Sequence, residues 1–151
     1  MGLIRKRKYR PVIGMLILFW CAFWCAPAVF AGEWKLYPGA NVDEPATRES
    51  RDAAAAAKMT HVQSTVYTTS DSFSSVASFY KGIATEYMMP RASGTTGKPK
   101  KYETYELYEA YFIFDGAKDL ADSKLWVKVQ RPFIGGDVRD VTAIVMTEKK
   151  K

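Results

Sequence analysis

A run of tyrosines and glutamates is the segment of this chain whose side chains are best suited to chemistry. The run covers residues 102–111 and reads Tyr-Glu-Thr-Tyr-Glu-Leu-Tyr-Glu-Ala-Tyr. Its aromatic members are Tyr102, Tyr105, Tyr108 and Tyr111, and Trp126 follows in the next apolar segment. Tyrosine and tryptophan offer a flat apolar face beside a hydrogen-bonding group. These five residues are therefore candidates for binding a sugar, a peptide or another small ligand.

The three-residue spacing of the run limits what it can form. On an extended strand, residues three apart point to opposite faces, so the tyrosines cannot make one continuous stacking row there. We expect Tyr105 or Tyr111 to complete the core while the other tyrosines cover its rim. Glu103, Glu106 and Glu109 are candidates for an acid–base pair of the glycosidase kind, but no partner carboxylate is identifiable in the sequence.

A lone histidine and a group of aspartates are the remaining candidates for chemistry. His61 is the single histidine, and it lacks a surrounding triad or metal-ligand motif, so we expect an ordinary strand-edge residue. Asp115, Asp119 and Asp122 offer oxygen ligands of the kind that Ca²⁺ prefers. Their spacing does not fit an EF-hand loop, and the alternative is a polar turn in which Asp115 caps the bend at Gly116. We therefore expect no bound metal or cofactor.

Residues 1–31 have the three-part layout of a secretory signal peptide. A head with five basic side chains precedes an uncharged apolar run over residues 12–26, and small residues stand at Val29 and Ala31. We expect cleavage after Ala31 and an exported protein, periplasmic or extracellular. Residues 12–31 carry no charged side chain, and about 20 apolar residues are long enough to span a bilayer. The alternative is therefore an anchor retained in the inner membrane.

Cleavage would change the composition of the working protein. Both cysteines, Cys21 and Cys25, leave with residues 1–31, so the remaining chain has no disulfide and no thiol chemistry. The leader also holds five of the 22 basic side chains and no acidic one, which leaves 17 basic against 16 acidic residues. This near-balance gives no reason to expect a nucleic-acid partner. The 120 residues that remain suffice for one domain with its own hydrophobic core.

The hydrophobic pattern predicts a single α+β domain over residues 32–151. We expect helices over residues 44–58 and 70–87, the second because its apolar residues recur at intervals of three and four. We expect strands over residues 61–69, 110–114, 124–131 and 141–147. The order α-β-α-β-β-β favours two layers, with an antiparallel sheet of about four strands and the amphipathic helix packed across one face. The last three strands are expected to form a meander.

Residues 91–101 contain two glycines, one proline and four basic side chains, so we expect an exposed, mobile loop. Its cations are Arg91, Lys98, Lys100 and Lys101, and a second basic group, Lys149, Lys150 and Lys151, forms what we expect to be a frayed tail. Both groups are candidates for weak contact with an anionic surface such as lipid head groups or envelope polymer. The alternative is that these side chains are solvated charges that only keep the protein soluble.

Three short motifs resemble those of an uncharacterised family of small exported bacterial proteins. They are the YPGA turn at residues 37–40, the segment YTTSDSF at residues 67–73 and the FYK segment at residues 79–81. Residues 110–115 and 125–132 look similar to the same group. The resemblance implies a turn before a strand and a capped helix start, but the family has no established activity, so it implies no catalytic residue.

These patterns favour a non-enzymatic, exported protein that binds a partner protein or a small apolar ligand through a sheet face or the tyrosine-rich segment. A first alternative is a small hydrolase that uses carboxylates together with His61. A second alternative is a peripheral protein that binds an envelope or membrane surface through the basic residues of 91–101.

Overall fold

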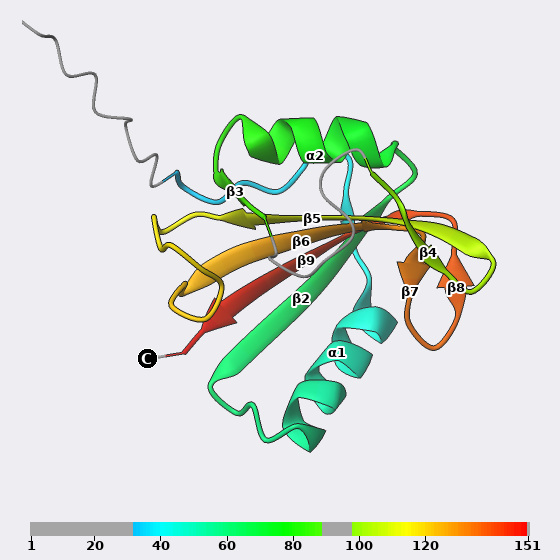
Figure 1. Ribbon diagram of the computed structural model, residues 1–151. Coiled ribbons are helices and arrows are strands. Elements are labelled where there is room, and N and C mark those ends of the chain that lie inside the picture. Colours follow the sequence, from blue (N-terminus) through cyan, green and yellow to red (C-terminus); the bar gives the residue numbers. More distant parts are fainter. Residues whose placement is uncertain (1–31, 89–97, 151) are drawn as a thin grey trace, which may run out of the picture.

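The computed structural model describes residues 32–88 and 98–150 of the 151-residue chain. The described residues form two helices and a seven-stranded sheet, with a separate two-stranded hairpin beside it (Figure 1). The helices are α1 (Glu44–Ala56) and α2 (Phe73–Lys81). The strands of the sheet are β1 (Asn41–Val42), β2 (Val62–Thr69), β3 (Thr85–Tyr87), β4 (Lys100–Tyr102), β5 (Tyr105–Ile113), β6 (Leu125–Arg131) and β9 (Thr142–Lys149). The hairpin consists of β7 (Phe133–Ile134) and β8 (Val138–Arg139).

The α+β class, the two helices and an antiparallel sheet are confirmed, but the prediction of about four strands is wrong. The sheet has the order β1-β2-β9-β6-β5-β3, and β4 pairs with the other end of β5. The expected meander is present as β5, β6 and β9, which pair in succession. The element order also differs from α-β-α-β-β-β, because β1, β3, β4, β7 and β8 add five strands of only two or three residues. Strands this short cannot show a period of two in the sequence.

The two helices cover opposite faces of the sheet, so the fold has three layers where we expected two (Figure 1). Adjacent residues of β9 show the two faces. Ile144 belongs to the apolar cluster under α2, whereas Ala143 packs with Ala46 of α1. We refer below to the α2-side face and the α1-side face of the sheet.

Helix α2 is shorter than the predicted 70–87. It begins after the N-cap Ser72, whose hydroxyl accepts a 3.2 Å hydrogen bond from the N–H of Ser75. It ends at Gly82, a residue of low helix propensity. The buried face contains the first half of the predicted stripe, namely Phe73, Val76, Ala77 and Tyr80. The residues of the second half form a turn and then β3, so the predicted apolar stripe is divided between a helix and a strand.

The α2-side face carries the main hydrophobic core. Tyr80 of α2 lies over the sheet, with its ring centroid 5.9 Å from that of Phe112 and 6.1 Å from that of Phe114. All three side chains are almost completely buried. The segment before β1 covers the rest of this face, since Trp34 stacks 5.8 Å from Tyr67.

Helix α1 is held mainly by polar contacts. Its N-cap, Asp43, accepts a 3.0 Å hydrogen bond from the N–H of Ala46. The Thr47 hydroxyl accepts from the Val66 N–H at 2.9 Å and donates to the carbonyl oxygen of the same residue at 3.3 Å. Arg51 donates through Nε to the carbonyl oxygen of Ser64 at 3.1 Å. These bonds tie one side of the helix to the outer edge of β2, while Ala46 and Thr47 are its only buried residues.

Several expectations concern residues outside the described part of the chain. The expected signal peptide (1–31), Arg91 and the adjoining residues up to 97, and Lys151 all lie there. Within residues 32–88 and 98–150, no helix is both long and apolar enough to cross a bilayer.

Two expectations about basic residues are wrong in the described part. The expected loop at 91–101 does not extend to Lys100 and Lys101, which form β4 and pair with Leu107 and Glu106. The expected frayed tail does not begin at Lys149, because this residue pairs with Val62 in the sheet.

Candidate functional site

The aromatic residues predicted to bind a ligand do not lie together on one surface of the sheet. Tyr108 lies on the α2-side face, with its ring centroid 5.4 Å from that of Phe73. Tyr111 and Trp126 lie on the α1-side face, since their strand neighbours belong to the cluster under α2. The expected alternation of the tyrosines is therefore present. The residue that completes the core is Tyr108, however, and not Tyr105 or Tyr111, because the register of β5 directs it toward α2.

Five side chains on the α1-side face of β3, β5 and β6 form a group that we call the open half-face. They are Tyr87 of β3, Glu109 and Tyr111 of β5, and Trp126 and Lys128 of β6. Tyr111 lies directly opposite Tyr87 on one side and Lys128 on the other, and residues paired in this way share a face. The sheet register therefore brings three aromatic rings and a cation from separate strands onto one surface.

An ion pair crosses the open half-face between β5 and β6. The Lys128 Nζ lies 2.8 Å from Glu109 Oε1, and the two side chains are only 28% and 11% exposed. Burial, and then the neighbouring Glu109 carboxylate, raise the pKa of Tyr111 to about 12. Tyr111 therefore stays protonated at physiological pH and can donate a hydrogen bond. The surface offers rings for stacking, with a hydroxyl, an ammonium and a carboxylate beside them.

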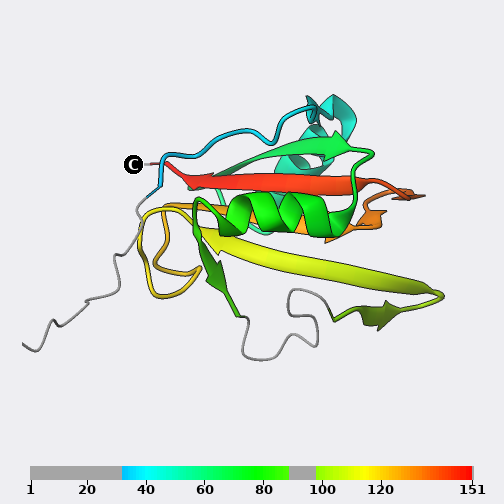
Figure 2. The same cartoon turned by 90° about the horizontal axis from the view of Figure 1, so that it is seen from above.

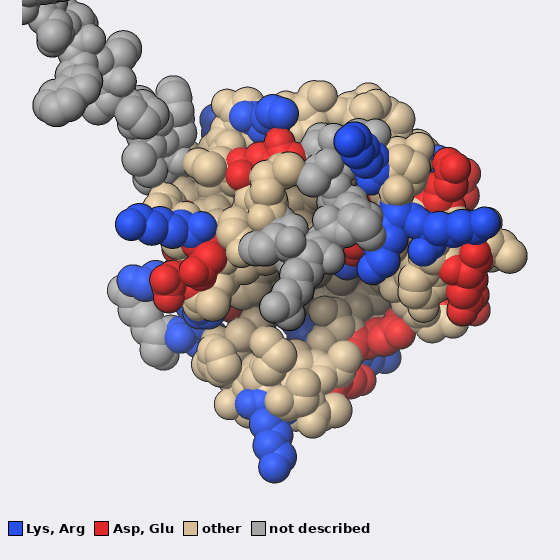
Figure 3. Space-filling view, in the orientation of Figure 1, with Lys and Arg blue, Asp and Glu red and all other residues tan. Residues whose placement is uncertain are grey.

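A pocket of about 270 Å³ adjoins the open half-face and shares Lys128 with it. Its wall is α1, its floor is the sheet and its closed end is the β7–β8 hairpin. The main lining residues are Glu49, Ser50 and Ala53 on the wall, Val66 and Val145 on the floor, and Phe133 and Gly135 at the end. Figure 3 shows the surface hollowed between α1 and the strands above it. The floor and the open half-face therefore form one continuous surface.

Gly135 allows the hairpin to close this pocket against α1. A Cβ at this residue would lie 2.8 Å from the Phe133 ring and 3.1 Å from the Glu49 Oε2. Opposite this contact, Arg139 of β8 pairs with the N-cap Asp43 at 2.6 Å and lies 4.9 Å from the centroid of Phe133. The hairpin is thus positioned by close backbone approach and by one ion pair.

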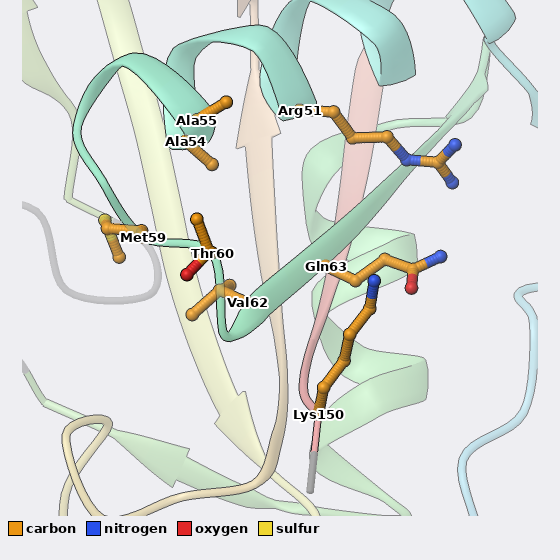
Figure 4. A pocket seen from close by; sticks show the side chains of 8 residues that line it. All are labelled: Arg51, Ala54, Ala55, Met59, Thr60, Val62, Gln63 and Lys150. Atoms are coloured by element: carbon orange, nitrogen blue, oxygen red, sulfur yellow. The ribbon is translucent and has the colours of Figure 1, made fainter.

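A second pocket, of about 310 Å³, lies where α1 ends beside β2 (Figure 4). Arg51, Gln63 and Lys150 extend along one side of it, and Met59 and Thr60 lie on the other. It shares no lining residue with the pocket that adjoins the open half-face. Its polar groups are exposed, and Arg51 already holds the Ser64 carbonyl.

The three aspartates that were weighed as calcium ligands make the bonds of a polar turn. Asp115 accepts hydrogen bonds from the Ser123 hydroxyl at 2.9 Å, from the Ala117 N–H at 3.3 Å and from the Lys124 N–H. Burial raises the pKa of Asp115, but these bonds outweigh it and lower the pKa below its ordinary value. Asp119 accepts from the N–H of Asp122. In the part of the chain that the structure describes, no three His, Cys, Asp or Glu side chains are grouped to hold a metal ion.

The residues of the hydrolase alternative do not converge. His61 is exposed before β2, and its side chain makes no hydrogen bond with any described residue. Glu103 occupies an exposed turn with a φ of 52°, and Glu106 is exposed opposite Lys101. Glu109 lies on the other face from Glu106, because three residues separate them on β5, so the two cannot act as an acid–base pair.

Tyr102 and Tyr105 lie together at the tip of the β4–β5 hairpin, away from the open half-face. They are paired directly across the turn and are 39% and 40% exposed. Figure 2 shows this hairpin extending beyond the other strands of the sheet. Lys100 and Lys101 lie beside the two rings on β4.

The site contains residues that the sequence did not single out, namely Tyr87, Lys128 and Gln130. Lys128 and Gln130 alternate with buried valines on β6, which is the signal that marks them as one face of a strand. No protein-family model, curated protein or solved structure matches the chain.

Proposed function

We propose that this protein is an exported, non-enzymatic binding protein whose ligand occupies the open half-face and the adjoining pocket. One observation carries the proposal. The sheet register places Tyr111 and Trp126 on one half-buried surface, around the Glu109–Lys128 ion pair. A surface that only had to be soluble would not need aromatic rings at this position, and exposed apolar patches rimmed by polar groups are typical of binding sites.

The geometry favours a ligand with both an apolar and a polar part. A flat or alkyl portion can stack on the rings of Tyr111 and Trp126, a contact worth about 0.5–1.5 kcal/mol per ring beyond the area buried. The Tyr111 hydroxyl and the Lys128 ammonium can donate to its polar groups, and Glu109 can accept from them. A small molecule or a peptide side chain of this type fits the adjoining pocket of about 270 Å³.

Export is the second part of the proposal and rests on the sequence of residues 1–31. The basic head, the uncharged run and the small residues at Val29 and Ala31 support it. A chain that keeps no cysteine after cleavage must be stabilised by its core, and the aromatic cluster under α2 is consistent with that requirement. The retained anchor over 12–31 stays as the alternative.

The two tryptophans of the cleaved chain provide a direct test, because they lie on opposite faces of the sheet. Trp34 packs against Tyr67 on the α2-side face, whereas Trp126 belongs to the open half-face. The protein is recovered from its host's envelope and analysed by native mass spectrometry. We expect an additional mass on the parent and on the Trp34→Phe variant, and its loss from the Trp126→Ala variant.

The control measurement uses fluorescence of the two single-tryptophan proteins. Once the additional mass is identified, adding that compound should change the emission of Trp34→Phe, in which only Trp126 reports. It should leave the emission of Trp126→Phe, in which only Trp34 reports, unchanged. A parent that carries no additional mass, together with a Trp34→Phe variant whose emission does not respond to envelope extract, would contradict the proposal.

A second candidate function is contact with an anionic surface through the β4–β5 hairpin. The exposed pair Tyr102 and Tyr105 beside Lys100 and Lys101 favours it, since tyrosine and lysine together are typical of membrane interfaces. Binding to vesicles of anionic phospholipid should then weaken as salt is raised. Binding that is insensitive to salt and to the double change Lys100→Ala and Lys101→Ala would exclude this function.

A further inference from the structure

Gly32 lies in close contact with the backbone at the end of α2. A Cβ at this residue would be 2.0 Å from the carbonyl oxygen of Ile83, so no side chain fits there without displacement. The backbone nitrogen of any residue is about 2.5 Å from its own Cβ, and the nitrogen of Gly32 therefore lies within roughly 4.5 Å of that oxygen. Only glycine fits at position 32 without displacement, and its backbone nitrogen lies near the carbonyl oxygen of Ile83.

The Ile83 carbonyl is a suitable acceptor for a cation. Ile83 lies just beyond the C-cap Gly82, beside the end of α2 at which the helix dipole is negative. The N–H of Ile83 donates to the carbonyl of Tyr80, but the carbonyl of Ile83 receives no backbone hydrogen bond from residues 32–88 or 98–150. A positively charged N–H donor close to Ile83 would therefore find its carbonyl oxygen available as a hydrogen-bond acceptor.

The same residue is where the sequence places the new N-terminus. The leader is expected to be cut after Ala31, a prediction that uses only the residues before the cut. The close contact of Gly32 with Ile83 concerns only the residue after it. Cleavage at this bond would turn the amide nitrogen of Gly32 into an ammonium with three N–H donors.

We propose that removal of residues 1–31 creates a built-in N-terminal anchor, in which the ammonium of Gly32 binds the Ile83 carbonyl at the C-terminal end of α2. The peptide bond between Ala31 and Gly32 is hydrolysed, with water supplying the new carboxylate oxygen of Ala31 and the two protons that convert the amide N–H of Gly32 into an ammonium. The inference rests on the export part of the proposed function and is independent of what the open half-face binds.

The segment that follows Gly32 keeps the anchor in place. Both views of the ribbon show it running alongside α2 from the end at which β3 begins (Figures 1 and 2). Trp34 stacks on Tyr67, and the Tyr37 hydroxyl donates a 2.8 Å hydrogen bond to the Asp71 carboxylate. Since these contacts fix the chain a few residues away, the ammonium does not have to lose much further freedom to bind.

The first test is the N-terminus of the exported protein. The full chain is expressed in a bacterial host, and the protein recovered from the envelope is measured by intact mass. We expect a mass corresponding to residues 32–151. A full-length mass, or a cut at any other bond, would overturn the proposal and would leave the proposed ligand site untouched.

The second test removes only the positive charge. Transamination with pyridoxal phosphate replaces the N-terminal amine of the cleaved protein by a carbonyl group and leaves lysines intact. We expect the unfolding equilibrium constant, measured in urea, to rise about two- to fivefold, as is usual for a cation lost from a helix C-terminus.

Two variants serve as controls for the second test. Gly32→Ala should itself be less stable, because its Cβ meets the Ile83 carbonyl, and should no longer respond to transamination. Glu33→Ala, a change at the neighbouring exposed residue, should respond as the parent does. An equal response in Gly32→Ala and the parent, or no response in either, would show that the ammonium does not bind at this point.

Discussion

The two faces of one sheet are stabilised in different ways. On the α2-side face, β5, the residue that follows it and β6 present Phe112, Phe114, Val127 and Val129 to a helix that buries four residues of its own. On the α1-side face, the same strands present the open half-face, and α1 buries only Ala46 and Thr47. The second helix is held instead by hydrogen bonds from Thr47 and Arg51 to the edge of β2.

This difference shows that neighbouring residues of one strand contribute to two faces with different properties. Because side chains alternate, consecutive residues such as Tyr111 and Phe112 serve different purposes without competing for space. The α2-side face supplies the apolar burial that a domain needs. The half-buried rings and the largely buried ion pair of the α1-side face contribute little to stability, and this is the face on which we propose that a ligand binds.

The largest expected effect tests the stabilising face. Phe112→Ala should lower the free energy of unfolding by about 3–5 kcal/mol, since it leaves a cavity beneath Tyr80. Tyr111→Ala, at the next residue but on the other face, should cost about 1–2 kcal/mol because its ring is only half-buried. Urea denaturation of both variants measures the contrast, and equal losses would contradict the division between the faces.

A smaller effect is expected where α1 meets β2. Thr47→Val keeps the shape of the side chain but leaves the Val66 N–H without its partner, while the Val66 carbonyl keeps the 2.9 Å hydrogen bond from the Asp43 N–H; the change should cost about 2 kcal/mol. Thr47→Ser keeps the hydroxyl and should cost less than half as much. The same urea experiment distinguishes them; if the valine variant were as stable as the serine variant, apolar packing rather than hydrogen bonding would hold α1.

The smallest expected effect depends on pH. Burial raises the pKa of Asp43, but the Ala46 N–H and the paired Arg139 outweigh it and lower the pKa below its ordinary value. A lowered folded-state pKa stabilises the fold above the pKa of the unfolded chain, near 4, and this contribution is lost as the pH falls through the folded-state value.

Asp43→Asn isolates this contribution because asparagine still caps a helix. At pH 7 the variant should be less stable than the parent by about 1 kcal/mol, the usual cost of losing a charge-assisted bond. The gap should narrow as the pH falls through the lowered pKa of the parent carboxyl, where that group also becomes protonated. A gap that stays constant as the pH is lowered from 7 through the acid range, measured in urea, would mean that the charge of Asp43 is not what stabilises α1.

The elements that bury many residues are predictable from the sequence. The apolar spacing of α2 and the β-branched or alternating residues of β2, β6 and β9 indicate those elements to within a few residues, apart from the end of α2. That end differs because Ile83 and Ala84 satisfy the helical spacing and also lead into β3. The local pattern cannot choose between the two, whereas pairing of β3 with β5 does.

The position of α1 is not predictable in the same way. Its sequence consists mainly of alanines and polar residues, and alanine gives high helix propensity without an apolar stripe that would indicate a face. The candidate site shares this limit. Tyr111 and Trp126 are recognisable as ligand-binding types, but only the register of β5 on β6 brings them together with Lys128 and separates them from Tyr108.

The bonds from Thr47 and Arg51 have a consequence for the behaviour of many copies of this protein together. Strand β1 covers β2 only at Tyr67 and Thr68, and the backbone beyond it would be an open edge of the sheet. Unpaired edges of this kind recruit strands from other molecules and start aggregation. Here the carbonyl of Ser64 and both backbone groups of Val66 are already occupied by helix side chains. A second molecule would have to displace α1 before it could add a strand, so the contacts that attach this helix also keep the protein from polymerising along that edge.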